Sequence, residues 1–81
     1  MDEKEIHERL NSLVDEEHEL RERLSRGEIT PEEEQARLHA VEVALDQCWD
    51  LLRQREALRE AGRDPNEAKV RPPEEVEGYL Q

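Results

Sequence analysis

The sequence predicts an all-α protein: an antiparallel two-helix hairpin of the coiled-coil type, followed by an extended C-terminal tail. Two observations carry this prediction. In two long segments, apolar residues recur at alternating steps of three and four, which is the spacing of a coiled-coil seam. A link of a few residues that contains a glycine separates the two segments. We expect the hairpin to span residues 1–62 and the tail to span residues 63–81.

The first helix is expected from about residue 3 to residue 26. Its seam consists of Ile6, Leu10, Leu13, Leu20 and Leu24. Glu17 occupies the remaining seam position, where a carboxylate costs stability unless it is paired. Two interpretations are open: Glu17 pairs with Arg21 at a wet edge of the seam, or it pairs across an interface and sets the register.

The link runs over residues 25–29. Gly27 suits the left-handed position that follows a helix, and Ile29 precedes the next helix as a hydrophobic staple would. A connection of this length forces two helices to pack antiparallel, as an αα-hairpin.

The second helix is expected from about residue 31 to residue 61. Thr30 is a good N-cap, Pro31 fits the first helical position, and Gly62 supplies the stop. Its seam consists of Leu38, Val41, Leu45, Cys48 and Leu52. Arg55 and Arg59 continue the seam beyond the reach of the first helix, so we expect acids from the tail or the N-terminus to pair with them.

The second helix has more apolar surface than the first helix can cover. Trp49 lies on one flank of its seam, and Leu51 and Leu58 lie on the other. A second copy of the chain would cover this surface in a four-helix bundle, and the chain's own tail, folded back, is the alternative. The candidate interaction residues are Trp49, Leu51, Leu58, Val76, Tyr79 and Leu80.

The tail is expected to contain short helical turns joined by an extended stretch. Residues 64–68 combine an N-cap aspartate with a proline at the next position, which predicts one turn of helix. Residues 70–73 end in two prolines and are therefore expected to be extended. Residues 74–81 are expected to form a short helix or to act as a docking peptide.

The net charge of −11 excludes some classes of partner. Phosphate backbones and anionic lipid surfaces should repel the chain, so direct binding to nucleic acid or membranes is not expected. Self-association, or a larger protein with a basic patch, fits the charge better. The start of the chain lacks the pattern of a signal peptide, and no stretch approaches the roughly 20 apolar residues of a membrane span, so we expect a cytoplasmic protein.

No catalytic residues or cofactors can be argued from the sequence. The single cysteine, Cys48, is on the apolar seam and is expected to be a buried hydrophobe. His7, His18 and His39 suggest a metal-binding or redox helical bundle as one alternative function, although the heptad pattern places no matching ligands inward. A second alternative is an acidic mimic that occupies a nucleic-acid-binding surface of another protein. We expect no metal site and favour a non-enzymatic protein-interaction module.

Four segments support a family resemblance. They are residues 13–18, 44–55, 70–72 and 76–80, and the run QCWDLLRQR at residues 47–55 is the most specific. Together they resemble a family of short actinobacterial proteins known as the domain of unknown function DUF2630. The resemblance implies an actinobacterial, intracellular setting, and it brings no activity, cofactor or site residue.

Overall fold

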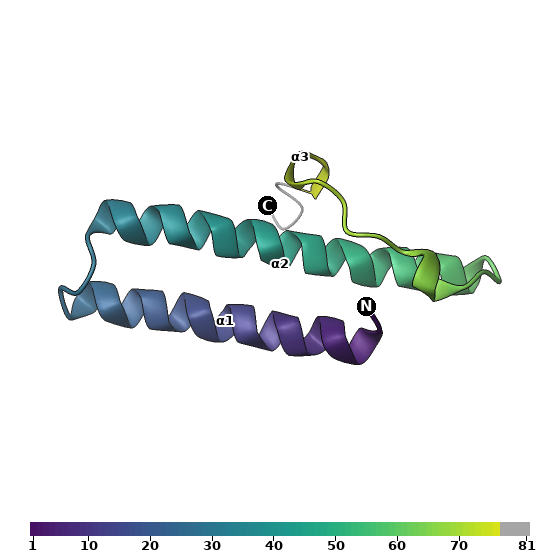
Figure 1. The fold of residues 1–81 in the computed structure, drawn as a ribbon, viewed down its shortest axis with the longest axis horizontal. Helices are drawn as coiled ribbons and strands as arrows, with labels where there is room; N and C mark the ends of the chain where they lie inside the picture. Colours follow the sequence, from purple (N-terminus) through teal and green to yellow (C-terminus); the bar gives the residue numbers. More distant parts are fainter. Residues whose placement is uncertain (77–81) are drawn as a thin grey trace.

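A computed structural model describes residues 1–76 of the chain and contains two long helices followed by a tail (Figure 1). Helix α1 spans Glu3–Ser25 and α2 spans Pro31–Glu60. In the tail, the 3₁₀ helix η1 spans Pro65–Glu67 and α3 spans Pro73–Val76. Helices α1 and α2 pack antiparallel along their length, which confirms the predicted hairpin.

Both long helices begin with a capping box. The side chains of Asp2 and Thr30 accept hydrogen bonds from the backbone N–H groups of Glu5 and Glu33, at 2.8 and 3.1 Å. In return, the carboxylates of Glu5 and Glu33 accept from the N–H groups of Asp2 and Thr30. Four donors that a bare helix start leaves unpaired are therefore satisfied locally.

Both helices end one residue earlier than expected, with a left-handed glycine after the cap. Gly27 and Gly62 have φ angles of 74° and 72°, which residues with a Cβ rarely adopt. After α1, the N–H of Glu28 donates to the carbonyl of Arg23 at 2.9 Å, and the same pattern of bonds closes α2. This is a Schellman ending, and it turns the chain sharply enough for α2 to return along α1.

The core lies along the α1–α2 seam. It consists of Ile6, Leu10, Leu13, Leu20, Ile29, Val41, Cys48 and Leu51. Leu24, Leu38, Leu45 and Leu52 are partly buried and pack against it. The three-four spacing therefore identified most of the residues that form the core, and Ile29 closes it at the link as a staple does.

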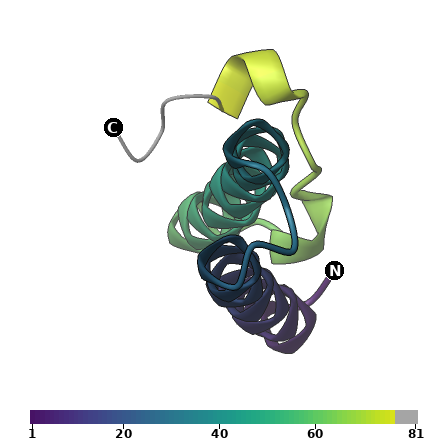
Figure 2. The ribbon, with the colours of Figure 1, turned by 90° about the vertical axis from the view of Figure 1, so that its left-hand side faces the viewer.

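The tail packs on α2. Both η1 and α3 contact that helix, and Figure 2 shows the tail passing along one side of the two long helices and then over α2. Val76, at the end of α3, is only 1% exposed. Helix α2 consequently lies between α1 and α3 (Figure 1), which is the arrangement expected if the tail folds back on the second helix.

Arg55 joins the N-terminus, α2 and the tail. Its side chain is 8% exposed, and its Nη1 donates to the carbonyl of Met1 at 3.0 Å, to Asn66 Oδ1 at 3.0 Å and to the carbonyl of Pro65 at 3.3 Å. Its Nε lies 3.8 Å from the carboxylate of Glu3. These contacts offset much of the cost of burying a guanidinium, although the Nε–H of Arg55 is itself buried without a hydrogen-bond partner among the described residues.

The two arginines that continue the seam share one acid. Arg59 also pairs with Glu3, so the N-terminus supplies the carboxylate that both were expected to meet. The tail meets Arg55 with oxygens of Pro65 and Asn66 instead of a carboxylate.

Replacing Arg55 should destabilise the whole fold. We expect Arg55→Ala to lower the free energy of unfolding by about 2–4 kcal/mol, because it leaves oxygens of both the N-terminus and the tail without a donor. The measurement is urea unfolding followed by circular dichroism. Arg59→Ala is the matched control, since Arg59 is 46% exposed and bonds to the same Glu3. It should cost less than about 1 kcal/mol. Equal losses for the two variants would contradict the role given to Arg55.

Candidate interaction surfaces

The residues predicted to form one apolar surface lie in different environments. Trp49 is 41% exposed, and Leu58 is half-buried. Leu51 is 5% exposed and belongs to the core, so the chain itself covers this residue, which the sequence left to a second copy or to the folded-back tail. The reason is tertiary: Met1 and Val70 line the same cavity of about 140 Å³ as Leu51, so the N-terminus and the tail cover that flank.

The tail residues of the same prediction are described only in part. Val76 is buried, whereas Tyr79 and Leu80 lie outside the described residues. At the seam, Glu17 pairs with Arg21 at 3.2 Å, which is the first of the two interpretations that the sequence left open.

Polar side chains of α2 hold the extended part of the tail. Gln54 Nε2 donates to the carbonyl of Lys69 at 2.8 Å, and the N–H of Lys69 donates to Gln54 Oε1 at 3.2 Å. The side-chain amide thus pairs with one residue's backbone as a neighbouring strand would. Gln47 Nε2 donates to the carbonyl of Arg71 at 3.0 Å.

An ion pair between a buried carboxylate and an exposed arginine completes this contact. The carboxylate of Asp50 is 4% exposed, lies 3.0 Å from Arg71 Nε and accepts from Gln54 Nε2 at 2.7 Å. Gln47, Asp50 and Gln54 are spaced by three and four residues and so lie on one face of α2. Sequence reasoning missed these residues because it assigned tail packing to apolar side chains. One signal was available in the sequence: these polar residues recur at helical spacing on the side of α2 away from the seam. The backbone of an extended tail needs hydrogen-bond partners, and such residues can provide them.

Removing the charge of Asp50 should loosen the tail without unfolding the hairpin. We expect Asp50→Asn to speed exchange of the Lys69 amide hydrogen roughly tenfold, since a charge-assisted hydrogen bond of about 1.5 kcal/mol is lost. Native-state hydrogen exchange measures this directly. Glu56→Gln changes an exposed carboxylate of the same helix and should leave the rate unchanged. An unaltered rate in Asp50→Asn would show that the ion pair does not hold the tail.

The pair of long helices has two edges, and the N-terminus and the tail cover the part of one edge where Leu51 lies. Two cavities of about 140 and 180 Å³ lie along this covered edge. Residues from both helices line them: Arg9, Glu16 and Arg23 from α1, and Arg37, Ala44 and Leu51 from α2. These residues recur every seven positions, as one edge of a coiled coil does. Met1 and Val70 lie on the same side.

The opposite edge follows from the same seven-residue repeat. The residues of the covered edge come one position before a seam residue, whereas those of the opposite edge come one position after a seam residue such as Leu13 or Cys48. This difference places the second set on the other side of the seam. The residues of this second set are His7, Val14 and Arg21 on α1, and Gln35, Glu42, Trp49 and Glu56 on α2. All seven are exposed, and we call this set the Trp49 edge.

The Trp49 edge has an apolar centre and polar ends. Val14 is 51% exposed and Trp49 is 41% exposed. The ion pair between Glu3 and Arg59 gives the register of the helices, and counting from it places Val14 level with Trp49 to within one residue. Two exposed apolar side chains therefore lie at about the same level near the middle of one edge.

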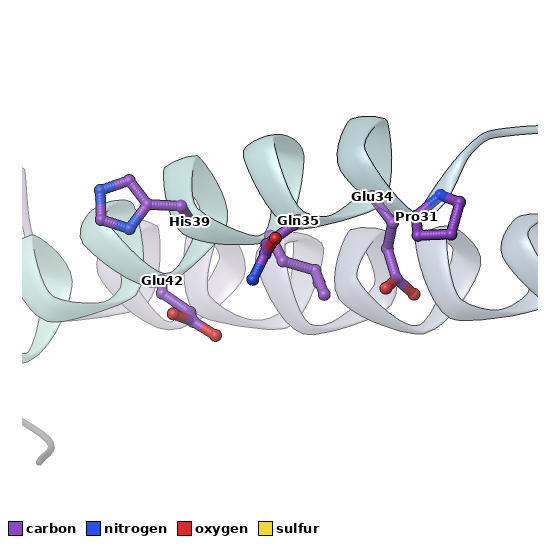
Figure 3. Close-up of a pocket in the computed structure, with 6 residues that line it drawn as sticks. Pro31, Glu34, Gln35, His39 and Glu42 are labelled. Atoms are coloured by element: carbon purple, nitrogen blue, oxygen red, sulfur yellow. The ribbon is translucent and has the colours of Figure 1, made fainter.

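A shallow groove lies along the start of α2 on this edge. Its volume is about 530 Å³, and Figure 3 shows the residues that line it. They are Pro31, Glu34, Gln35, Leu38, His39 and Glu42. Glu42 comes seven residues before Trp49, which corresponds to about 10 Å along the helix. The groove therefore ends about two helical turns from the apolar centre, on the same edge.

The remaining candidates for chemistry are dispersed. Cys48 is 3% exposed, and burial raises the pKa of its thiol, although nearby Arg9 acts in the opposite direction. His7, His18 and His39 are all exposed. Within residues 1–76, no group of three or more histidine, cysteine, aspartate or glutamate side chains is placed to hold a metal ion.

Cys48 should react slowly with thiol reagents. At pH 8 we expect the folded chain to react with a disulfide reagent on the order of a hundredfold more slowly than the chain unfolded in urea, because the thiol is buried and its raised pKa lowers the thiolate fraction. The variant Cys48→Ala, Ser12→Cys carries the thiol at an exposed position and should react rapidly in both conditions. Rapid reaction of folded Cys48 would contradict its burial.

Comparison with known proteins identifies the family. The model of the family described as "Protein of unknown function (DUF2630)" matches residues 2–81. The chain belongs to this family. Similar members are the uncharacterized proteins Rv0898c of Mycobacterium tuberculosis and Mb0922c of Mycobacterium bovis. Each is 57% identical over 70 residues, which cover 86% of this chain and 80% of the relative.

The family resemblance drawn from the sequence is thereby confirmed, and its actinobacterial setting agrees with the mycobacterial relatives. No solved structure matches the chain. Among residues 1–76, no helix combines the length and the apolar character needed to cross a membrane.

Proposed function

We propose that this chain is a non-enzymatic protein-interaction module whose contact surface is the Trp49 edge. The observation that carries the proposal is the exposure of Trp49, the chain's single tryptophan, at the centre of an edge that the described tail leaves open. Exposed tryptophan is uncommon on a surface without a partner, and tryptophan is enriched among residues that dominate binding energy.

The surroundings of Trp49 support the same function. Val14 adds a second apolar side chain, and the charged residues Arg21, Glu42 and Glu56 flank the pair. An apolar centre with a polar rim is the usual composition of a protein interface. The net charge of −11 favours either a second copy or a larger protein with a basic patch over nucleic acid or an anionic membrane.

The alternative functions have less support among the described residues. The histidines are dispersed, so a metal-binding or redox bundle has no assembled site there. An acidic mimic would use the outer face of α1, where Glu8, Asp15 and Glu22 lie, and that face has no exposed large apolar side chain comparable to Trp49.

Site-specific photo-crosslinking in mycobacterial cells tests the proposal. A benzoylphenylalanine residue replaces Trp49 or, in a second variant, Val14. We expect covalent adducts at several-fold higher yield than from the control positions Lys4 and Glu60, which are exposed outside the Trp49 edge. The physical reason is that a crosslinker reacts with a surface that a partner covers. Equal yields at all four positions would contradict the proposal.

A further inference from the structure

We propose that the partner on the Trp49 edge is a second copy of the chain, related by a two-fold axis parallel to the long helices. The proposal rests on the proposed function, because it requires the Trp49 edge to be a contact surface. In this arrangement, α1 of each copy faces α2 of the other, and the two hairpins form a four-helix bundle.

The two helices contribute complementary patterns to the Trp49 edge. On α1 the pattern is His7, Val14, Arg21, which contains no acid. On α2 the corresponding pattern is Glu56, Trp49, Glu42, with an acid on each side of the apolar residue. A surface with this pattern is complementary to itself when α1 meets α2 of another copy.

The register determines which residues would face each other. Counting from the ion pair between Glu3 and Arg59, Arg21 lies level with Glu42 to within one residue. A two-fold axis parallel to the helices keeps these levels, so Val14 faces Trp49 of the second copy and Arg21 faces Glu42 of the second copy. His7 then faces Glu56 in the same way.

The other symmetric arrangement is disfavoured by charge. A two-fold axis in the contact plane but perpendicular to the helices would place each helix on its own counterpart. Glu42 would then face Glu56 of the second copy at both ends of α2, and each acid would meet another acid. Like charges opposed across an interface are destabilising, so the axis parallel to the helices is selected.

Arg21 is available for this contact. Its side chain is 61% exposed and pairs with Glu17 at 3.2 Å within α1. A guanidinium has five N–H donors, so a second carboxylate can bind without displacing the first. The apolar residues also fit: Leu38, Leu45 and Leu52 are only partly buried along the α2 seam, as they would be if a bundle were to complete their burial.

Electrostatic repulsion does not prevent the association. The chain has a net charge of −11, but the Trp49 edge contains one arginine and only two glutamates. Most of the acids therefore lie on faces that point away from the contact. At physiological ionic strength, interactions between exposed charges decay over about 8 Å, which screens much of that repulsion.

Reciprocal charge exchange tests the geometry. The monomer–dimer Kd of the full chain is measured by sedimentation equilibrium for the wild type, Arg21→Glu, Glu42→Arg, and an equimolar mixture of the two variants. We expect a wild-type dimer, a Kd raised roughly tenfold in each variant alone because two like-charged pairs replace two ion pairs, and recovery to near the wild-type value in the mixture. Each 1:1 heterodimer regains both ion pairs across the interface.

The mixture separates contacts between copies from contacts within a chain. Any repulsion inside one chain, such as Glu17 with the new acid at position 21, persists in the mixture and cannot account for recovery. Lys4→Glu and Glu8→Arg make the same charge changes on outward positions of α1 and should leave the Kd near the wild-type value. Circular dichroism verifies that every variant is folded.

Three results would overturn the proposal. Tighter association of Glu42→Arg alone would indicate the perpendicular axis, and a mixture no better than its components would exclude the predicted pairing. A wild-type chain that stays monomeric at several hundred micromolar would exclude the second copy as the partner. This holds even if a variant that ends at Val76 forms a dimer, because the proposal concerns the full chain. If that monomer still gave position-49 adducts with another protein, the proposed function would stand and only this inference would fail.

Discussion

The guanidinium of Arg55 connects three parts of the chain that are far apart in sequence. It lies on α2 and bonds to the carbonyl of Met1 and to the η1 residues Pro65 and Asn66, with Glu3 as the nearest counter-charge. Because a buried charge must be compensated, neither the N-terminus nor the tail can leave this position without leaving donors unpaired. The N-terminus, α2 and η1 are therefore stabilised together at this position.

Helix α2 satisfies two different kinds of neighbour. Toward α1 it presents the apolar seam, whose burial is non-directional and tolerates small shifts. Toward the tail it presents Gln47, Asp50 and Gln54, whose hydrogen bonds specify the position of individual backbone groups. The extended residues of the tail have no strand to pair with, so these side chains replace one. Such a contact aligns the tail without requiring a large apolar area, which a chain of this composition lacks.

The N-terminus and the tail lie over part of one edge of the hairpin, and the residues of the opposite edge are exposed. The N-terminus and Val70 lie on the covered edge with Leu51, whereas Trp49 and Val14 lie on the edge that the described tail does not reach. The chain thus removes from solvent apolar surface of α2, such as Leu51, that α1 does not cover. On the Trp49 edge, Val14 and Trp49 form a small apolar centre within a charged rim, which is the composition of a specific interface.

The sequence by itself determined the hairpin. Capping residues such as Thr30, glycines such as Gly27, and the three-four seam act through local backbone geometry and helical periodicity, and both can be evaluated without knowing the fold. Only the tertiary structure decided that Leu51 is buried and that Asp50 holds the tail. Those outcomes depend on where the tail, about twenty residues further along the chain, packs on α2. The free energies of the competing positions of the tail on α2 differ by too little for hydrophobic periodicity to distinguish them.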